Sequence, residues 1–494
     1  MVTVSPALRP SVAPKRLVLD VTSIRRTFFI LGWLLLLVSP FTPDPLPVAV
    51  GGFVPWVLLS IIGLPSMPVA AIYYFVWQWS QIYARAVLSI IDGEAISNGV
   101  AGPGVVNAYW YSLASLVALA IAFRLVFSGL RGPSPEEENA HLEWRPRDLF
   151  LLYCGTLVLA VACTYASRVV PGLSQQLEAV SRLKIVAEFL LFVTILGTGQ
   201  GNKFLLAVVA IEIVIGFSGL LSDFRGVFVY LALAAIAARI VLRVTSIVGS
   251  VVWLALLLTL ALFWTAVKTE YREYATGGEE TQHFSIPIED RLSYLGNLAM
   301  SSGNIDWGLA SYALINRFAY IDIFGSVISY QEASREAAPM RQWQDALGHV
   351  FKPRFFFPDK AALSDTETYA RLAGLDPALV LRDTTSISVG YMAENYVDMG
   401  FPGMLAGMFV LGLMLAGVLR YFMKARHLPW MVKQGIAVAF VYNVAGGGVE
   451  GSLPKLFGAI IMFFLVYLLL AKFVLPIGLQ WLQARAGTGH AQTP

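Results

Sequence analysis

Long runs of apolar residues alternate with short polar loops along most of this chain. The runs approach the length that an α-helix needs to cross a hydrocarbon core about 30 Å thick, and the loops between them are rich in proline, glycine and charge. The chain is therefore expected to be an all-α, polytopic helical membrane protein. About twelve spans are predicted, at residues 27–41, 46–62, 67–90, 105–128, 148–166, 184–199, 203–221, 226–241, 245–266, 400–421, 431–447 and 454–477.

One polar stretch, residues 267–399, interrupts this alternation and predicts a large loop with helices of its own. Within it, Trp307–Ser329 has apolar residues at helical spacing together with Arg317 and Asp322, which predicts one amphipathic helix on the membrane surface. The predicted organisation is an N-terminal segment (1–26), a block of about nine spans (27–266), the loop (267–399), a block of about three spans (400–479) and a tail (480–494).

The basic residues near the span ends indicate the orientation, because Lys and Arg are retained on the cytoplasmic side during insertion. With twelve spans, both termini are expected to be cytoplasmic and the large loop to be periplasmic in a bacterium. The basic segment before Thr27–Phe41 lacks a small-residue cleavage site, so a first span is expected there rather than a cleaved signal peptide. The basic residues that fall on the cytoplasmic side are Arg9, Lys15, Arg16, Arg25, Arg26, Arg131, Arg145, Arg147, Arg239, Arg243, Arg420, Lys424, Arg426 and Lys433.

The composition of 57% hydrophobic and 14% charged residues excludes a soluble domain. The net charge of +3 reflects the cytoplasmic loops, so no nucleic-acid partner is expected. Cys154 and Cys163 lie nine residues apart in one predicted span, on opposite helix faces, and cannot pair with each other. The sequence has no GxxxxGK[ST] loop and no His and acid spacing typical of zinc sites, so no metal, no cofactor and no ATP-driven transport are predicted.

The chemistry of the large loop gathers in two short segments. In VFKPRFFFPDK, residues 350–360, two prolines preclude a regular helix, and three phenylalanines can anchor the turn in the membrane interface. That geometry would hold Arg354, Asp359 and Lys360 at the level of the headgroups. The second segment, TTSISVGYMAENYVDMG at residues 384–400, leads into the next span and places Glu394 and Asp398 just above the membrane.

In order and topology, these segments resemble the Wzy-type polymerases of O-antigen and exopolysaccharide repeat units, also called oligosaccharide repeat unit polymerases. Members combine many spans and a late periplasmic loop with an Arg-Gly, a PR-aromatic-aromatic-P-x-K turn and a later G-x-x-x-E-x-Y. This chain has Arg225-Gly226, the turn at 353–360, and Gly390, Glu394 and Tyr396. The resemblance covers about residues 218–450, and Phe357 stands where the family usually has Trp.

The resemblance implies a membrane glycosyltransferase that polymerises lipid-linked oligosaccharide repeat units. Such an enzyme transfers a growing glycan from undecaprenyl diphosphate to an acceptor sugar hydroxyl, at the periplasmic face of the bacterial inner membrane. A transmembrane bundle of the glycosyltransferase class C kind is one form that this fold would take. The implied partners are the undecaprenyl-diphosphate-linked oligosaccharide, the lipid bilayer, a chain-length regulator and a flippase.

The implied reaction assigns roles to particular side chains. The leaving diphosphate gains negative charge, which the planar fork of an arginine stabilises well, and the acceptor hydroxyl needs a base to take its proton. The predicted diphosphate ligands are Arg225, Arg317, Arg354 and Lys360. The predicted base is Glu394, then Asp359 and His349, and further candidate site residues are Arg168, Arg182, Lys184 and Glu188.

Each of these residues also has a structural interpretation. Arg225 can be an interfacial anchor that pairs with Asp223, Arg317 the polar face of a surface helix, and Glu394 a helix cap. The turn at 350–360 can be an elbow, and Arg168, Arg182 and Lys184 can be anchors. Glu188 and Glu212 lie inside predicted spans, where a carboxyl group pairs, is neutral or functions. For Glu212 a hydrogen bond between helices is the favoured explanation, whereas Glu188 could line a cavity that reaches the loop.

Three other functions stay open. An O-antigen ligase would share the spans, the lipid diphosphate donor and the arginines, but would transfer glycan to a lipid A core. A lipid-linked oligosaccharide flippase should show two similar halves and short loops, and the sequence has no internal repeat. A scaffolding subunit would leave the arginine-containing turns unexplained.

Overall fold

The computed structural model describes residues 18–99, 102–218, 223–277, 285–301, 303, 305–334, 340–352, 357, 360, 364–376, 387–445, 449 and 451–487. Over these residues the regular structure is helical, apart from one isolated antiparallel bridge between Val18 and Val241. The all-α prediction is therefore confirmed for the described part of the chain.

Seven helices of the described residues are long and apolar enough to cross a membrane. They are α1 (Val21–Val38), which continues to Phe41, α2 (Pro45–Ile62), α4 (Gly104–Phe127), α6 (Pro146–Val169), α11 (Val244–Thr276), α18 (Tyr391–Met423) and α20 (Leu453–Leu469), which continues through the π-helix η7 (Leu470–Val474) into α21 (Leu475–Gly487). These helices indicate a membrane protein with several spans.

The other five predicted spans are also helical, but each is shorter or more polar than those seven. They correspond to α3 (Ala70–Asp92), α8 (Leu183–Thr198), α9 (Asn202–Ser218), α10 (Arg225–Ala237) and α19 (Trp430–Ala445). Helices of 13 to 17 residues, as in α8, α9, α10 and α19, are short for a 30 Å core, which needs about 20 residues. The twelve-span count therefore stays a prediction.

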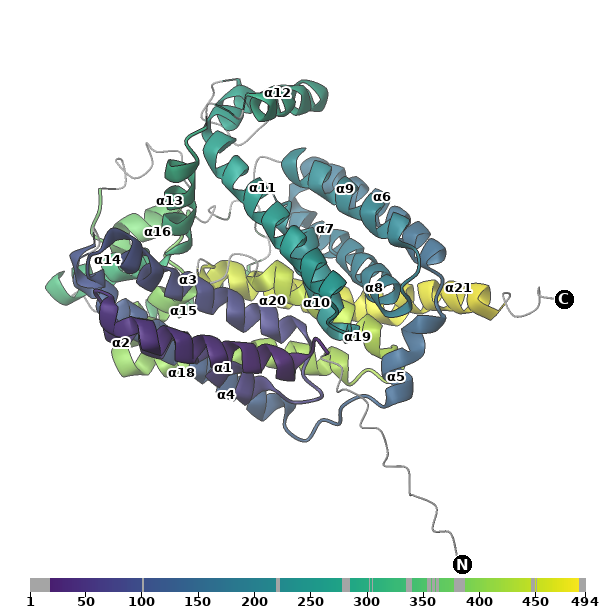
Figure 1. Cartoon of the computed structure of the whole chain (residues 1–494), viewed down its shortest axis with the longest axis horizontal. Coiled ribbons are helices and arrows are strands. Elements are labelled where there is room, and N and C mark those ends of the chain that lie inside the picture. The colour runs from purple at the N-terminus through teal and green to yellow at the C-terminus, as the bar shows by residue number, and fades with distance from the viewer. Residues whose placement is uncertain are drawn as a thin grey trace, which may run out of the picture.

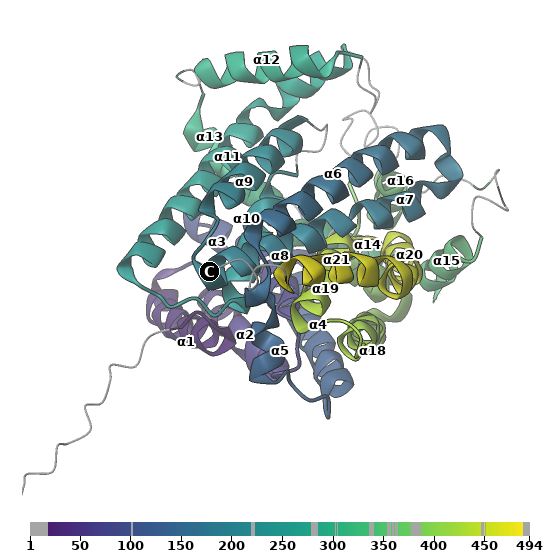
Figure 2. The ribbon, with the colours of Figure 1, turned by 90° about the vertical axis from the view of Figure 1, so that its right-hand side faces the viewer.

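The helices α8, α10 and α19 form the centre of the bundle, and α3 packs against α19 and α10 (Figures 1 and 2). Nearly every apolar side chain of α8 is buried, as expected of a helix that is surrounded by others. α18 runs along α4 at one side of the bundle. α11 crosses the bundle diagonally beside α10 (Figure 1). The polar side chains that α3, α8 and α10 carry are thus enclosed by neighbouring helices.

The large loop contains short helices rather than an extended chain. These are α12 (Ile288–Met300), α13 (Trp307–Phe318), α14 (Ile321–Ser334), α15 (Arg341–Val350) and α16 (Asp365–Leu372). α12 lies at the edge of the bundle in both views and contacts α11 and α9, whereas α14 packs against α4 and α15 against α20 (Figures 1 and 2). Most of the loop therefore rests on one end of the bundle.

The single amphipathic helix predicted over Trp307–Ser329 is wrong, because the chain breaks there into α13 and α14. Ala319, at the break, is 2% exposed and packs against Ala84 and Leu88 of α3. α14 is no surface helix either: Gly325 crosses Gly104 so closely that a Cβ on Gly104 would lie 2.4 Å from the Gly325 carbonyl oxygen. Packing against α3 and α4 thus overrides the local helical pattern.

α18 consists of two helical pieces that meet at a kink. The backbone of Gly400 (φ 62°, ψ −176°) and Phe401 (φ −102°, ψ 132°) is not helical. The Phe401 ring stacks on Tyr111 of α4, with 4.0 Å between the ring centroids. The kink lies at the predicted start of the tenth span, so residues 391–399 form a separate helical segment that carries Glu394 and Asp398.

Candidate functional site

The starts of α8 and α10 meet inside the bundle and bring together side chains of opposite charge. Arg182, which immediately precedes α8, donates to Glu178 (Nη2 to Oε1, 3.0 Å) and lies 4.0 Å from Asp223 (Nη1 to Oδ2). Asp223 in turn stands just before Arg225, the first residue of α10. Helix N-termini carry partial positive charge, so two such ends and two arginines surround one carboxylate here.

Aromatic side chains enclose Arg225. Its guanidinium lies over the Trp77 ring, 5.1 Å from the ring centroid, and hydrogen-bonds with Tyr442 of α19. The Tyr442 hydroxyl also donates to Asp223, and its ring stacks on Tyr73 with 6.1 Å between centroids. The aromatic rings shield this arginine from water, which strengthens its electrostatic interactions.

A second ionic contact lies deeper between α6, α8 and α9. The Lys184 Nζ lies 2.6 Å from Glu212 Oε2, and the Tyr153 hydroxyl donates to Glu212 Oε1 at 2.5 Å. The favoured explanation of Glu212, a hydrogen bond between helices, is confirmed by these contacts. Glu188, one turn along α8 from Lys184, is completely buried, and within the described part of the chain neither of its carboxyl oxygens has a hydrogen-bond partner.

We call the less exposed of these residues the buried charge cluster: Arg182, Lys184, Glu188, Glu212 and Arg225, with Tyr73, Trp77, Tyr153 and Tyr442. Glu178 and Asp223, whose side chains are 56% and 48% exposed, lie at its edge. Four of the predicted site residues, Arg182, Lys184, Glu188 and Arg225, belong to it. Figure 2 shows the helices that supply it, α3, α6, α8, α9, α10 and α19, next to one another.

A group of three cations stands close to the cluster. Lys268 and Arg272, one turn apart on α11, interact electrostatically with Arg317 of α13. Among the described residues, no carboxylate lies within ion-pair distance of Lys268 or Arg317. The residue after Arg317, Phe318, packs edge-on against Trp77 with 4.8 Å between centroids, so this basic group adjoins the aromatic wall of the cluster.

Two carboxylates at the end of the loop, Glu394 and Asp398, bind backbone N–H groups at the starts of other helices. Glu394 is 2% exposed, and its Oε2 accepts the Leu453 N–H of α20 at 2.5 Å. Both oxygens of Asp398 accept backbone N–H groups at the start of α15, from Gln342 and Trp343, each at 2.9 Å. Glu394 therefore contacts the start of a helix, as the capping interpretation expects. That helix is α20, which is distant in sequence from Glu394.

The remaining predicted residues lie elsewhere. His349 lies in the last turn of α15, and its carbonyl oxygen accepts a hydrogen bond from Lys360 Nζ, so these two predicted residues are neighbours. Arg168 is exposed and lies over Tyr165 of its own helix, 5.4 Å from the ring centroid, as an anchor would. Arg354 and Asp359 lie outside the described residues, as do most of the residues of the predicted turn.

The carboxyl group of Asp322 in the loop has a raised pKa. Desolvation raises the pKa of Asp322 on α14, and the ion pair with Arg85 of α3 (Nε to Oδ1, 3.5 Å) only partly offsets this. The pair ties the loop to α3 a few turns from Trp77.

Several members of the cluster could not be identified as site residues from the sequence. Tyr73, Trp77, Tyr153 and Tyr442 sit in apolar spans, where an aromatic residue is usually a packing residue. The sequence feature that pointed to the cluster was the presence of Glu188 and Glu212 inside predicted spans, together with Lys184. It indicated that partners exist but did not indicate which ones.

Among the described residues, no group of three or more His, Cys, Asp or Glu side chains is placed to hold a metal ion. Cys154 and Cys163 are both free thiols, as their spacing predicts. Comparison with protein-family models matches residues 21–428 to a family described as a domain of unknown function (DUF8712). No curated protein and no solved structure matches the chain.

Proposed function

The chain belongs to the DUF8712 family, and we propose that it is a membrane glycosyltransferase that polymerises lipid-linked oligosaccharide repeat units. It would transfer a glycan from undecaprenyl diphosphate to an acceptor sugar hydroxyl at the outer face of a bacterial inner membrane. The observation that carries this proposal is the meeting of the α8 and α10 N-termini with Arg182 and Arg225 inside the bundle.

This arrangement suits an anionic group that approaches from the membrane. A diphosphate ester that enters here would replace Glu178 and Asp223 as partner of the arginines, beside two helix N-termini that also favour negative charge. Trp77 and Tyr73 would form an apolar wall beside it, a suitable surface for a polyprenyl chain. The basic group Lys268, Arg272 and Arg317 lies on the route to the loop and would draw the anion toward the cluster.

The residues divide the reaction into two tasks. Arg182 and Arg225 would stabilise the charge that develops on the leaving diphosphate as the bond between the sugar C1 and the phosphate oxygen breaks. A base in the loop would accept the proton of the acceptor hydroxyl while its oxygen bonds to C1. The candidate bases are Glu394, Asp359 and His349. The burial of Glu394 and its contact with Leu453 mean that it must exchange that hydrogen bond to act as the base.

Reconstituted protein tests the proposal directly. Purified lipid-linked repeat unit is supplied without nucleotide or metal, and polymer length is measured for wild type, Arg225→Ala, Arg225→Lys and the matched control Arg168→Ala. Wild type should form polymer, and Arg225→Ala should lose about 10²–10³-fold in rate, the effect of removing a preorganised electrostatic donor. Arg225→Lys should retain an intermediate rate because it keeps the charge but loses the fork.

The controls separate the competing functions. Arg168→Ala should stay within about threefold of wild type, because this arginine contacts only its own helix. Wild type that leaves the repeat unit unpolymerised but transfers glycan to a lipid A acceptor is a ligase. Wild type that does neither, and instead moves the lipid across the bilayer, is a flippase, and the proposal is then wrong.

A further inference from the structure

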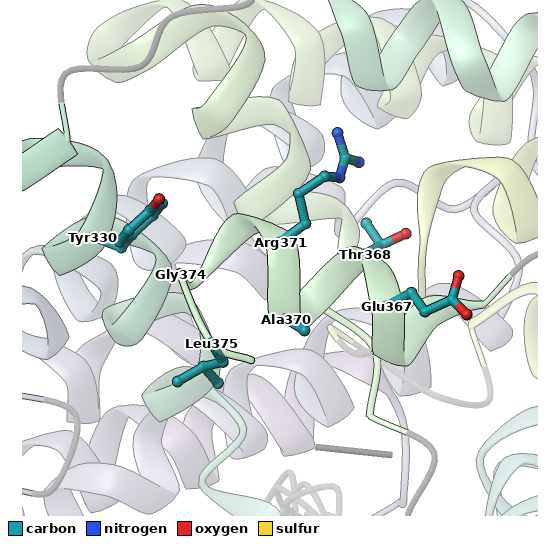
Figure 3. Close-up of a pocket in the computed structure, with 7 residues that line it drawn as sticks. All are labelled: Tyr330, Glu367, Thr368, Ala370, Arg371, Gly374 and Leu375. Carbon is teal, nitrogen blue, oxygen red and sulfur yellow. The ribbon is translucent and has the colours of Figure 1, made fainter. Parts of the chain in front are cut away.

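An open pocket of about 700 Å³ lies on the loop between α14 and α16. Its walls carry Tyr330 from α14, Glu367, Thr368 and Arg371 from α16, and the turn at Gly374 and Leu375 (Figure 3). The volume falls within the range of small-molecule sites. None of these residues belongs to the buried charge cluster or to the predicted catalytic set, so the pocket is a separate feature of the loop.

The backbone is built to bring the Tyr330 ring to the pocket wall. Gly374 has φ +66°, and a Cβ at this position would lie 2.1 Å from the Tyr330 ring. Only glycine therefore permits both the left-handed backbone and the close approach of the ring. The same two helices are joined by a hydrogen bond from Gln331 Nε2 of α14 to the Leu372 carbonyl oxygen of α16, at 3.4 Å.

The charged side chains of the pocket have no ionic partner within the described residues. Glu367 and Arg371 stand four positions apart on α16, a spacing that normally lets such residues pair, yet no ion pair joins them. In Figure 3 the Arg371 guanidinium and the Glu367 carboxylate point in different directions, and the Tyr330 hydroxyl points toward the same side as Arg371. The Arg371 guanidinium and the Glu367 carboxylate can thus each contact a ligand.

The electrostatic surroundings of Arg371 favour an anion. Desolvation and the neighbouring Arg341 lower the pKa of Arg371, although Asp345 and Glu394 act in the opposite direction. A carboxylate in the pocket would relieve this unfavourable environment and could accept two hydrogen bonds from the guanidinium fork.

We propose that this pocket binds a sugar residue that bears a carboxylate, as the acceptor end of an acidic glycan. Arg371 binds the carboxylate, Tyr330 offers its ring to the apolar face of the sugar, and Thr368 and Glu367 hydrogen-bond its hydroxyl groups. The position fits an acceptor site, because Arg371 lies within electrostatic reach of Glu394, the first candidate base. The role as acceptor site rests on the proposed function, whereas binding of the sugar acid does not.

Binding is measured with the full chain in lipid nanodiscs, by isothermal titration or saturation-transfer NMR. The probes are trigalacturonic acid, the neutral trisaccharide maltotriose and inorganic phosphate. Trigalacturonic acid should bind about tenfold or more tightly than maltotriose, because a charge-assisted hydrogen bond contributes more than a neutral one. Arg371→Ala should weaken its binding about tenfold, Arg371→Lys less, and Tyr330→Ala should weaken both sugars.

Arg341→Ala is the matched control, since Arg341 is an exposed cation near the pocket that pairs with Asp345 at 3.9 Å and is not part of the pocket wall. It should change the affinity by less than about twofold. Equal weakening by Arg341→Ala and Arg371→Ala, equal affinity for the acidic and neutral sugars, or displacement of trigalacturonic acid by equimolar phosphate overturns the inference. These outcomes are independent of polymer formation, so a chain that binds the sugar acid but makes no polymer refutes only the proposed function.

Discussion

Two lysine–carboxylate pairs of nearly equal length lie in different regions of this protein. Lys184 and Glu212 are 2.6 Å apart in the buried charge cluster, with side chains 17% and 11% exposed. Lys455 and Asp365 are 2.5 Å apart on the loop side, where the lysine is 55% exposed and the aspartate 9% exposed, so the two pairs differ in the lysine. Distance alone does not distinguish them, but access to water does: the first pair has exchanged hydration for protein contacts, whereas the lysine of the second keeps much of its hydration.

The difference extends to the two regions as wholes. In the cluster, charges contact charges and aromatic rings from helices that are far apart in sequence. In the loop, the carboxylates of Glu394 and Asp398 bind backbone N–H groups and fix where α20 and α15 begin. The cluster therefore joins helices through pairs of charges, and these loop carboxylates position the starts of helices. We expect mutations in the two regions to have different effects on stability.

The largest effect is expected from Lys184→Met, which leaves Glu212 in the bundle with Tyr153 as its one remaining hydrogen-bond partner among the described residues. Loss of one member of a buried ion pair costs about 3–5 kcal/mol of unfolding free energy, because the remaining charge stays without compensation. Reversible unfolding in mixed micelles measures this. The double variant Lys184→Met/Glu212→Gln should recover much of the loss, and Lys455→Met should cost no more than about 1 kcal/mol. Equal costs for Lys184→Met and Lys455→Met would remove the distinction between the two regions.

A smaller effect is expected from Asp398→Ala in the loop. This change removes the carboxylate that accepts the N–H groups of Gln342 and Trp343, and a lost N-terminal cap costs about 1–2 kcal/mol. Hydrogen exchange of the first turn of α15 should speed up while α20 stays protected. Asp345→Ala, on the same helix, is the control and should leave exchange at the first turn unchanged. Faster exchange throughout the bundle would mean that Asp398 supports more than a helix start.

Glu188→Gln is expected to change stability by less than about 1 kcal/mol, although the residue is completely buried. Since neither oxygen has a hydrogen-bond partner among the described residues, an amide of the same shape should replace the carboxyl group with little loss. Unfolding measurements should place this variant close to wild type and far from Lys184→Met. A loss of 3 kcal/mol or more would show that Glu188 takes part in the ionic contacts.

The smallest effect concerns pH and Asp322. Because its pKa is raised above the ordinary value of 3.8 in the folded protein, folding favours the protonated form. The stabilisation is present below pH 3.8 and is lost as pH rises through the higher folded pKa. The melting temperature of wild type should therefore fall as pH rises over that interval, and that of Asp322→Asn should fall less. An equal slope for both proteins would contradict the raised pKa of Asp322.

The helices of the bundle could be predicted from the sequence because apolar runs and their lengths report on the membrane directly. Each of the twelve predicted segments has most of its described residues in a helix, even where α8 and α10 are short for a membrane span. The break between α13 and α14 could not be predicted, because it depends on how Ala319 packs against a helix more than 200 residues earlier in the chain. Local periodicity contains no information about such contacts.

The candidate site was predicted only in part. Arg225, Arg182 and Glu188 were identified because charges in or beside apolar spans demand an explanation. The partners of Arg225 were not, since a tyrosine such as Tyr442 has the same appearance in sequence whether it fills space or binds an arginine. The backbone groups that Glu394 and Asp398 bind could not be predicted, because α20 and α15 are distant in sequence from the helix that carries these two carboxylates.

The length of α11 has a consequence for the kind of bilayer in which this protein works. Its 33 residues rise about 1.5 Å each and span about 50 Å, well beyond a hydrocarbon core of about 30 Å, and Lys268 and Arg272 stand in its last three turns. Membrane thickness therefore sets the height of these cations above the acyl chains. In a bilayer of longer lipids α11 must stand more upright or draw its charges inward, so hydrophobic mismatch becomes a means of tuning how readily an anion reaches the bundle.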